Sequence, residues 1–170
     1  GCGVIGLFAL LWARTLGAGR LIASEVAPAR IAAAQQLADV VLDPTKVDLT
    51  SELERLTDGL GPRVLFECTG GPEVQANTLE QVQRGGQVIL LGISFDPVPM
   101  TLMSMNLREV SLKGCDAYSS LSGCGEFPMT LQFLKDKRID PGTIPLISMR
   151  LIEINKAFKA AKAGQYAKVI

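Results

Sequence analysis

Short apolar runs that are rich in Val, Ile and Leu alternate along the chain with helix-forming segments of about ten residues. This alternation constrains the fold most, because strands separated by such helices form βαβ units with parallel strands. We expect strands at 20–26, 40–42, 64–68, 87–91, 110–115 and 168–170, and helices at 4–16, 28–38, 48–57, 72–82, 126–135 and 153–163. The pattern predicts an α/β fold with a doubly wound parallel sheet in three layers, in which the strand at 64–68 is buried.

The composition describes one folded domain that spans residues 1–170. Lys and Arg together number 17, as do Asp and Glu, and 48% of the residues are hydrophobic. A net charge of +0 without a run of basic residues provides no electrostatic attraction for nucleic acid. The longest apolar stretch, at 4–13, is roughly half as long as a membrane-spanning helix. We therefore expect neither nucleic-acid binding nor membrane insertion.

The cysteines and the missing histidines limit the chemistry of the chain. Cys2, Cys68, Cys115 and Cys124 form no CxxC pair, which disfavours a structural zinc site and a disulfide scaffold alike. We interpret them as reduced thiols and expect a cytoplasmic protein. The chain has no His, which is the commonest metal ligand and general base. We expect no metal site and no catalytic residue within these 170 residues.

The chain opens with GCGVIG and continues directly into the first expected helix. This is the G-x-G-x-x-G spacing of a Rossmann-type dinucleotide-binding turn. Gly1 would allow the tight turn, Gly3 would let the backbone approach a pyrophosphate, and Gly6 would let the helix pack closely on the sheet. The motif by itself is weak, and a glycine turn without a ligand is the alternative. A phosphate-binding loop of the G-x-x-x-x-G-K-[ST] type is absent, which disfavours an NTPase.

Glu25 strengthens the dinucleotide hypothesis. It lies 19 residues after Gly6, at the end of the RLIASEV strand, where an acid would accept hydrogen bonds from the adenosine ribose. A carboxylate there repels a 2′-phosphate and so favours NAD over NADP, although Arg30 could partly offset this preference. The alternative for Glu25 is a solvated strand end without a ligand.

Several segments in order resemble the cofactor-binding domain of the zinc-type medium-chain alcohol dehydrogenases, particularly the polyol, butanediol and threonine dehydrogenases. The resemblance covers almost the whole chain. It rests on the segments GCGVIG, LGAGRLIASE, VLFECTGGPE, GGQVILLGIS, LREVSLKGC and AFKAAKAGQYAKVI. It implies the NAD-binding domain of an oxidoreductase that interconverts a secondary alcohol and a ketone.

The resemblance also implies a set of cofactor-binding residues. The backbone of Cys2, Gly3, Val4 and Ile5 would face the pyrophosphate, Glu25 would hold the adenine ribose, and Arg30 would lie beside the adenosine. Thr69 and Gly70 would line the cofactor groove, where an ordinary helix-capping turn is the alternative. Leu91, Gly92 and Ile93 would run beside the nicotinamide, backbone groups near Cys115 would anchor its carboxamide, and Lys168 would reach the pyrophosphate. For Lys168, a solvated lysine on an edge strand is the alternative.

Two departures from the family pattern bear on what the chain can do. The family binds its catalytic zinc in an N-terminal domain that these residues do not include, so zinc is expected only there. The strand that should precede Gly1 is also absent, and in the 3-2-1-4-5-6 order it would lie in the middle of the sheet. We expect two parallel strands to lack a partner here and a longer protein to supply the missing strand.

The resemblance further implies a homodimer or homotetramer, which would form through edge strands at 98–102 and 110–115. Pro97 and Pro99 could instead block this pairing. Two other functions remain as alternatives. One is a zinc-independent, NADPH-dependent, quinone-reductase-like member of the superfamily, which the acid at Glu25 disfavours. The other is a nucleotide-binding module without catalysis.

Overall fold

Contacts between residues divide the chain into two compact units, which we describe in turn. The computed structural model describes residues 1–116, 120–121 and 124–170. The first unit comprises Leu42–Cys115 together with Gly1, and the second comprises Cys2–Val41 and Asp116–Ile170. Each unit contains strands and helices, so the expected α/β class is confirmed.

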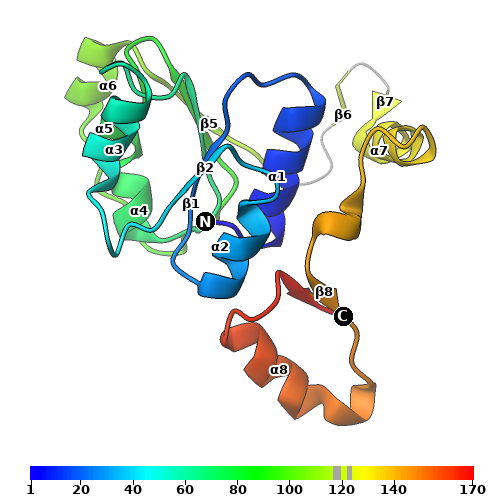
Figure 1. The fold of residues 1–170 in the computed structure, drawn as a ribbon. Helices are drawn as coiled ribbons and strands as arrows, with labels where there is room; N and C mark the ends of the chain where they lie inside the picture. The colour runs from blue at the N-terminus through cyan, green and yellow to red at the C-terminus, as the bar shows by residue number, and fades with distance from the viewer. Residues whose placement is uncertain (117–119, 122–123) are drawn as a thin grey trace. The chain divides into compact units, whose positions relative to one another are not determined.

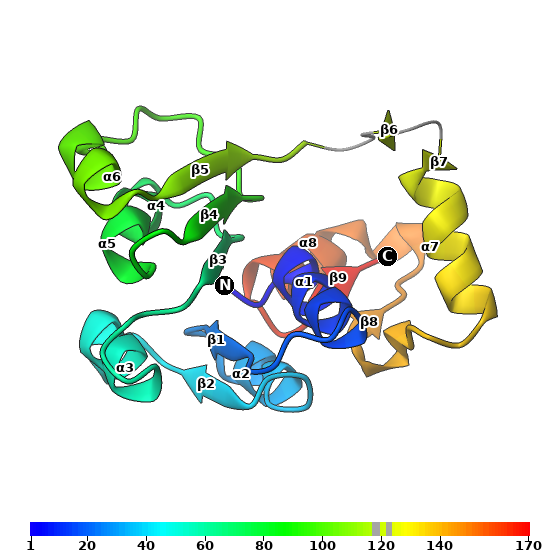
Figure 2. The same ribbon diagram turned by 90° about the horizontal axis from the view of Figure 1, so that it is seen from above.

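The first unit is built on a three-stranded parallel sheet. The strands are β3 (Val64–Glu67), β4 (Gln87–Leu90) and β5 (Ser111–Gly114), in the order β3-β4-β5. Val64 pairs with Gln87, which in turn pairs with Ser111. The three strands therefore start in register, and their carboxyl ends meet at one edge of the sheet (Figure 2).

The helices of this unit are α3 (Leu49–Leu56), α4 (Pro72–Ala76), α5 (Thr78–Gln81) and α6 (Leu102–Arg108). Helices α5 and α6 lie along one face of the sheet (Figure 1). The core on this face consists of Leu79, Val82, Val88 and Val110. On β3, Val64 and Phe66 point to the other face and are 41% and 43% exposed. The expectation of a buried β3 is therefore wrong for these two residues. Successive side chains of a strand point to opposite faces of the sheet, and helices of this unit cover only one of these faces.

The helix expected at 72–82 is broken into α4 and α5 at Asn77. The side-chain amide of Asn77 donates a hydrogen bond of 2.8 Å to the carbonyl oxygen of Glu73. In a continuous helix that carbonyl would accept a hydrogen bond from the backbone N–H of Asn77. This N–H donates to the carbonyl of Val74 instead. The break is therefore the ordinary competition of an Asn side chain with a helical backbone.

The edge strand expected at 98–102 is wrong. Residues 98–101 form no strand, and Leu102 is the first residue of α6. Pro97 and Pro99 lack a backbone N–H and fix φ, so a ladder of strand hydrogen bonds cannot form there. The other expected edge strand is present as β5, which pairs with β4 along one edge only among the described residues.

The second unit contains α1 (Val4–Thr15), α2 (Pro28–Ala34) and a sheet of β1 (Ile22–Ser24) and β2 (Val40–Leu42). Pro28 opens α2 as expected, but this helix ends four residues early, in a turn at 35–37. Its core contains Cys2, Leu7, Ala23, Ala33, Ala34 and Ile144. The small side chains of Ala23, Ala33 and Ala34 allow strand and helix to pack closely.

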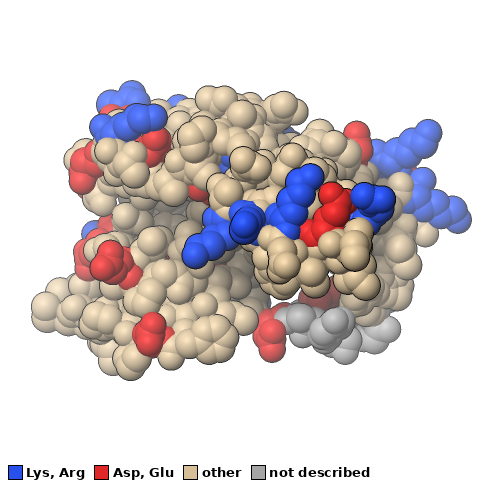
Figure 3. Space-filling model, turned by 90° about the horizontal axis from the view of Figure 1, so that it is seen from below, with Lys and Arg blue, Asp and Glu red and all other residues tan. Residues whose placement is uncertain are grey.

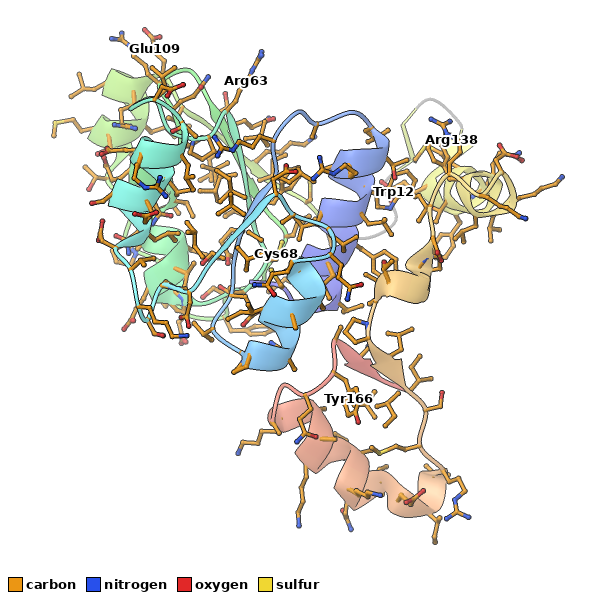
Figure 4. All side chains as sticks on the ribbon, in the orientation of Figure 1. Trp12, Arg63, Cys68, Glu109, Arg138 and Tyr166 are labelled. Carbon is orange, nitrogen blue, oxygen red and sulfur yellow. The ribbon has the colours of Figure 1, made fainter. Side chains whose placement is uncertain are left out.

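The rest of the second unit contains α7 (Glu126–Lys135), α8 (Ile154–Lys162), β6 (Ser120–Leu121), β7 (Cys124–Gly125), β8 (Leu146–Ile147), β9 (Lys168–Val169) and two 3-10 turns, η1 (Pro141–Thr143) and η2 (Leu151–Glu153). Strands β8 and β9 pair in parallel. The rings of Trp12 and Phe133 join α1 to α7, with centroids 4.9 Å apart, and the guanidinium of Arg138 lies 4.1 Å above Phe133 (Figure 4).

Among the described residues, β1 pairs only with β2 and β3 pairs only with β4, so each keeps one free edge. This agrees with the expectation that two parallel strands lack a partner. The strand that would pair with them stays a prediction.

No helix in the described part of the chain is long and apolar enough to cross a membrane. On the face that Figure 3 shows, basic and acidic side chains lie close to one another between larger uncharged areas.

Candidate functional site

The candidate site of the second unit is the glycine turn at the start of α1. Gly3 is the N-cap residue, and no side chain caps the helix. The first N–H groups of a helix have no acceptor within it, so this end of α1 can donate hydrogen bonds to an anion. A Cβ atom added to Gly3 would have no atom within 4 Å, which leaves open space beside these donors. Gly6 is buried in the helix.

Glu25 directly follows β1 and is hydrogen-bonded to the glycine turn. Its Oε2 accepts a hydrogen bond of 2.6 Å from the N–H of Cys2, and its Oε1 accepts bonds of 2.8 and 2.9 Å from the N–H groups of Val26 and Ala27. Only 5% of the residue is exposed, so it is not a solvated strand end. A carboxylate has about four acceptor positions, so these three bonds leave one for a ligand.

The charge of Glu25 is held by its surroundings. Burial raises the pKa of Glu25, but hydrogen bonds from the backbone N–H groups of Ala27, Cys2 and Val26, together with the charge of Arg30, outweigh burial. The pKa therefore lies below its ordinary value of 4.5, and the group is ionised at neutral pH.

Two other expected residues lie in this unit. The guanidinium of Arg30 lies beside Gly164, with Nη2 3.5 Å from the position of an added Cβ. Its Nε is buried and has no hydrogen-bond partner among the described residues. Lys168 is exposed on β9. The structure includes no ligand, so the roles of both side chains stay predictions.

The candidate site of the first unit consists of two turns, at 69–71 after β3 and at 91–93 after β4. The two turns are in backbone contact. A Cβ atom on Gly92 would overlap the backbone nitrogen of Gly70, and one on Gly70 would overlap the carbonyl of Ile93. Gly70 also has a φ of +71°, which side chains rarely adopt. Both positions therefore require glycine.

Gly1 belongs to the same unit as these turns. A Cβ atom added to Gly1 would lie 2.6 Å from the Cγ2 of Thr69. The methyl group of Thr69 thus occupies the space that a side chain at position 1 would need. Gly1 is expected to allow the tight turn, and the contact with Thr69 is a separate reason that favours a residue without a side chain here.

Glu67 and Gln75 are buried polar residues beside these turns, and the sequence did not single them out. Glu67 ends β3 and is 2% exposed, and Gln75 lies on α4 and is 4% exposed. The side chain of Glu67 accepts hydrogen bonds from the turn at 69–71, and the amide of Gln75 donates to Glu67 and to the carbonyl of Gly92 in the turn at 91–93. An acid at the end of an otherwise apolar strand, two residues before T-G-G, was the available signal.

Cys115 and Cys68 are free thiols that follow β5 and β3. The backbone N–H of Cys115 donates to the carbonyl of Leu90, so this amide continues the ladder between β4 and β5. Burial raises the pKa of the Cys68 thiol, which keeps it protonated at neutral pH (Figure 4).

The described residues do not fit a catalytic zinc ion. They contain no group of three His, Cys, Asp or Glu side chains that could hold a metal, and the chain has no His. We derive no zinc-dependent step from these residues.

Parallel strands with crossover helices and a glycine turn at the start of a helix define a Rossmann-type domain. The model of the zinc-binding dehydrogenase family matches residues 4–136, and the chain belongs to that family. Sorbitol dehydrogenase of Pongo abelii is 30% identical over 177 residues, which cover 100% of this chain and 47% of the relative. The chain thus spans about half the length of the curated relatives that it matches.

Solved structures agree with this assignment. 2R,3R-butanediol dehydrogenase of Bacillus subtilis is similar with a TM-score of 0.85 and 26% identity, over 99% of this chain and 48% of that one. A short chain alcohol dehydrogenase of Escherichia coli CFT073, solved in complex with NADH, has a TM-score of 0.84 over 95% of this chain and 47% of its own. At 16% identity, the latter shows the fold alone.

We expect Gly92→Ala to lower the free energy of unfolding by about 1–3 kcal/mol, because the new methyl group overlaps backbone that cannot move away easily. Urea denaturation measures this change. Gly114→Ala is the matched control, since a Cβ atom there meets nothing within 4 Å. Equal stabilities of the two variants would contradict the close contact of the turns.

We also expect the free energy of unfolding to fall as the pH is lowered below about 5. The pKa values of Glu25 and Glu67 lie below 4.5 in the folded chain, so the unfolded chain binds more protons in this range. Their stabilising contribution is complete above the unfolded pKa and is lost as the pH falls through the folded pKa. Urea denaturation from about pH 7 to about pH 3 should show a shallower decline for Glu67→Gln than for the wild type. If the free energies of unfolding of Glu67→Gln and of the wild type fall equally steeply with pH, the lowered pKa of Glu67 is contradicted.

Proposed function

We propose that this chain binds NAD(H) and is the cofactor-binding domain of an NAD-dependent alcohol or polyol dehydrogenase. The observation that carries the proposal is the uncapped start of α1 with open space beside Gly3. Exposed helix N–H groups next to open space suit a pyrophosphate, which is anionic and needs close approach to the backbone. In this role the backbone of residues 2–5 faces the pyrophosphate, while the N–H of Cys2 is already donated to Glu25.

Glu25 supports NAD over NADP. Its carboxylate is ionised, and about one acceptor position remains after its three backbone hydrogen bonds. A ribose hydroxyl could donate to that position, whereas a 2′-phosphate would meet a negative charge. Arg30, whose Nε has no partner among the described residues, lies within electrostatic reach of Glu25 and is proposed to lie beside the adenosine.

We propose that the two turns of the first unit line the nicotinamide end of the cofactor, with Thr69 and Gly70 on one turn and Leu91, Gly92 and Ile93 on the other. Backbone groups near Cys115 would hold the carboxamide, and Lys168 would reach the pyrophosphate. The bound nicotinamide accepts or donates a hydride at its ring. The residues of this chain bind and orient it, and we place the alcohol or ketone site, the zinc and the catalytic groups outside them.

The natural-length protein should bind NADH more tightly than NADPH, and Gly3→Ala should weaken NADH binding about tenfold or more. The variant should fold normally, because its Cβ atom meets nothing in the protein, whereas it enters the space assigned to the pyrophosphate. Isothermal titration calorimetry measures the affinities, and Gly114→Ala is the control.

Three outcomes would contradict the proposal. If Gly3→Ala binds NADH as tightly as the wild type, the glycine turn does not face the pyrophosphate. If NADPH binds more tightly than NADH, the quinone-reductase-like alternative is favoured instead. Cofactor binding without alcohol oxidation by the natural-length protein would favour a nucleotide-binding module.

A homo-oligomer that forms through the outer edge of β5 is a further part of the proposal, and the cytoplasm is its proposed location. The N–H groups of Ser111 and Cys115 point toward β4, where they donate to Gly86 and Leu90. Successive backbone N–H groups of a strand point to opposite edges, so the N–H groups of Leu112 and Gly114 point to the outer edge of β5. A second copy could pair with them there.

Light scattering of the natural-length protein should therefore give at least twice the mass of one chain. Gly114→Pro should lower this mass, because it removes an outward N–H group while the bonds to β4 remain. Gly114→Ala should leave the mass unchanged. If Gly114→Pro assembles like the wild type, the edge of β5 is not the interface.

A further inference from the structure

The carboxylate of Glu67 has all of its acceptor positions filled by one turn and one helix. Its Oε1 accepts hydrogen bonds from the N–H and the hydroxyl of Thr69, at 2.6 and 2.5 Å. Its Oε2 accepts bonds from the N–H of Gly70 at 3.1 Å and from the amide of Gln75 at 2.9 Å. A carboxylate offers about four acceptor positions, so none is left for a ligand.

Gln75 extends this network to the second turn. Its Nε2 has two hydrogens, of which one is donated to Glu67 and the other to the carbonyl oxygen of Gly92, 2.9 Å away. The backbone carbonyl of Glu67 also accepts bonds of 2.8 and 2.9 Å from the N–H groups of Leu91 and Gly92. Glu67 therefore binds the turn at 69–71 through its side chain and the turn at 91–93 through its backbone.

The charge of Glu67 is maintained in this position. Burial raises its pKa, but the hydrogen bonds from Thr69, Gln75 and Gly70 outweigh burial, so the pKa lies below its ordinary value. A protonated carboxyl would replace one acceptor position with a donor that faces another donor. The ionised form is thus the one that matches the four donors.

We propose that Glu67 and Gln75 are positioning residues, which hold the two turns at one fixed separation and thereby shape the nicotinamide end of the cofactor site. The inference rests on the proposed function, because it assigns the two turns to that site. Neither side chain need touch the cofactor, since each is buried and its bonds are made to the turns. A small displacement of groups that orient a reacting cofactor has a large effect, so accurate placement is a sufficient reason for a buried carboxylate here.

The test compares Glu67→Gln with Val110→Ala in the natural-length protein. Val110 is 4% exposed and precedes β5, at the opposite ends of the strands from the two turns. Both variants lose stability, which urea denaturation measures. Only Glu67→Gln should weaken NADH binding, by about tenfold or more, because its amide group faces donors with a donor of its own. Equal NADH affinities of the two variants would overturn the inference.

Hydrogen–deuterium exchange provides a readout that needs no cofactor. In Glu67→Gln, the peptides that contain residues 69–71 and 90–93 should exchange faster than in the wild type and in Val110→Ala. If Glu67→Gln does not fold, Gln75→Met takes its place, because it keeps a similar shape and loses both amide bonds. Unchanged exchange in the variant that folds would overturn the inference.

The outcomes separate this inference from the function on which it rests. If the wild type binds no NADH, the proposed function fails and this inference fails with it. If the wild type binds NADH and Glu67→Gln binds it equally well, only this inference fails. In the double variant with Gln75→Met, the losses of affinity should be less than additive, because both residues act through one network.

Discussion

A carboxylate that is removed from water needs hydrogen-bond donors, and the candidate site of each unit is organised by this requirement. Glu25 fills three of its about four acceptor positions with backbone N–H groups of the glycine turn and of its own strand end, and one position stays open. Glu67 meets the requirement with a second turn and the amide of Gln75. In each case an acid at the carboxyl end of a strand fixes the loop that follows or lies beside it. The irregular backbone at these strand ends is therefore as well determined as the strands themselves.

Much of the fold follows from local patterns. Pro28 and Asp48 mark helix starts, and Asp48 indeed caps α3 through the N–H of Ser51. The errors arise where a side chain competes with the backbone or where coverage depends on distant residues. Asn77 breaks a helix by bonding to a carbonyl, and the exposure of Phe66 depends on which elements cover the sheet. Neither effect is visible in the periodicity of apolar residues.

The candidate site was predictable only in part. The glycine spacing and Glu25 predict the candidate site of the second unit, because binding of a pyrophosphate and a ribose favours those residue types in that order. Glu67 and Gln75 could not be identified in this way, since they are eight residues apart on different elements and their partners are mostly backbone groups. A hydrogen bond to a backbone group does not depend on the residue type of the partner, so it produces no sequence motif. Such networks become visible only when the turns are seen in space.

Gly3 and Gly92 are constrained in opposite ways, although both are glycines in turns. Gly92 has protein atoms where a side chain would be, and Gly3 has open space there. A screen of variants that sorts by cellular abundance would therefore detect substitutions at Gly92 and overlook those at Gly3. Under the proposed function, selection for growth on an alcohol would detect substitutions at both positions. The difference between the two screens, read along the whole chain, would map the residues that the protein keeps for its ligand and not for its own folding.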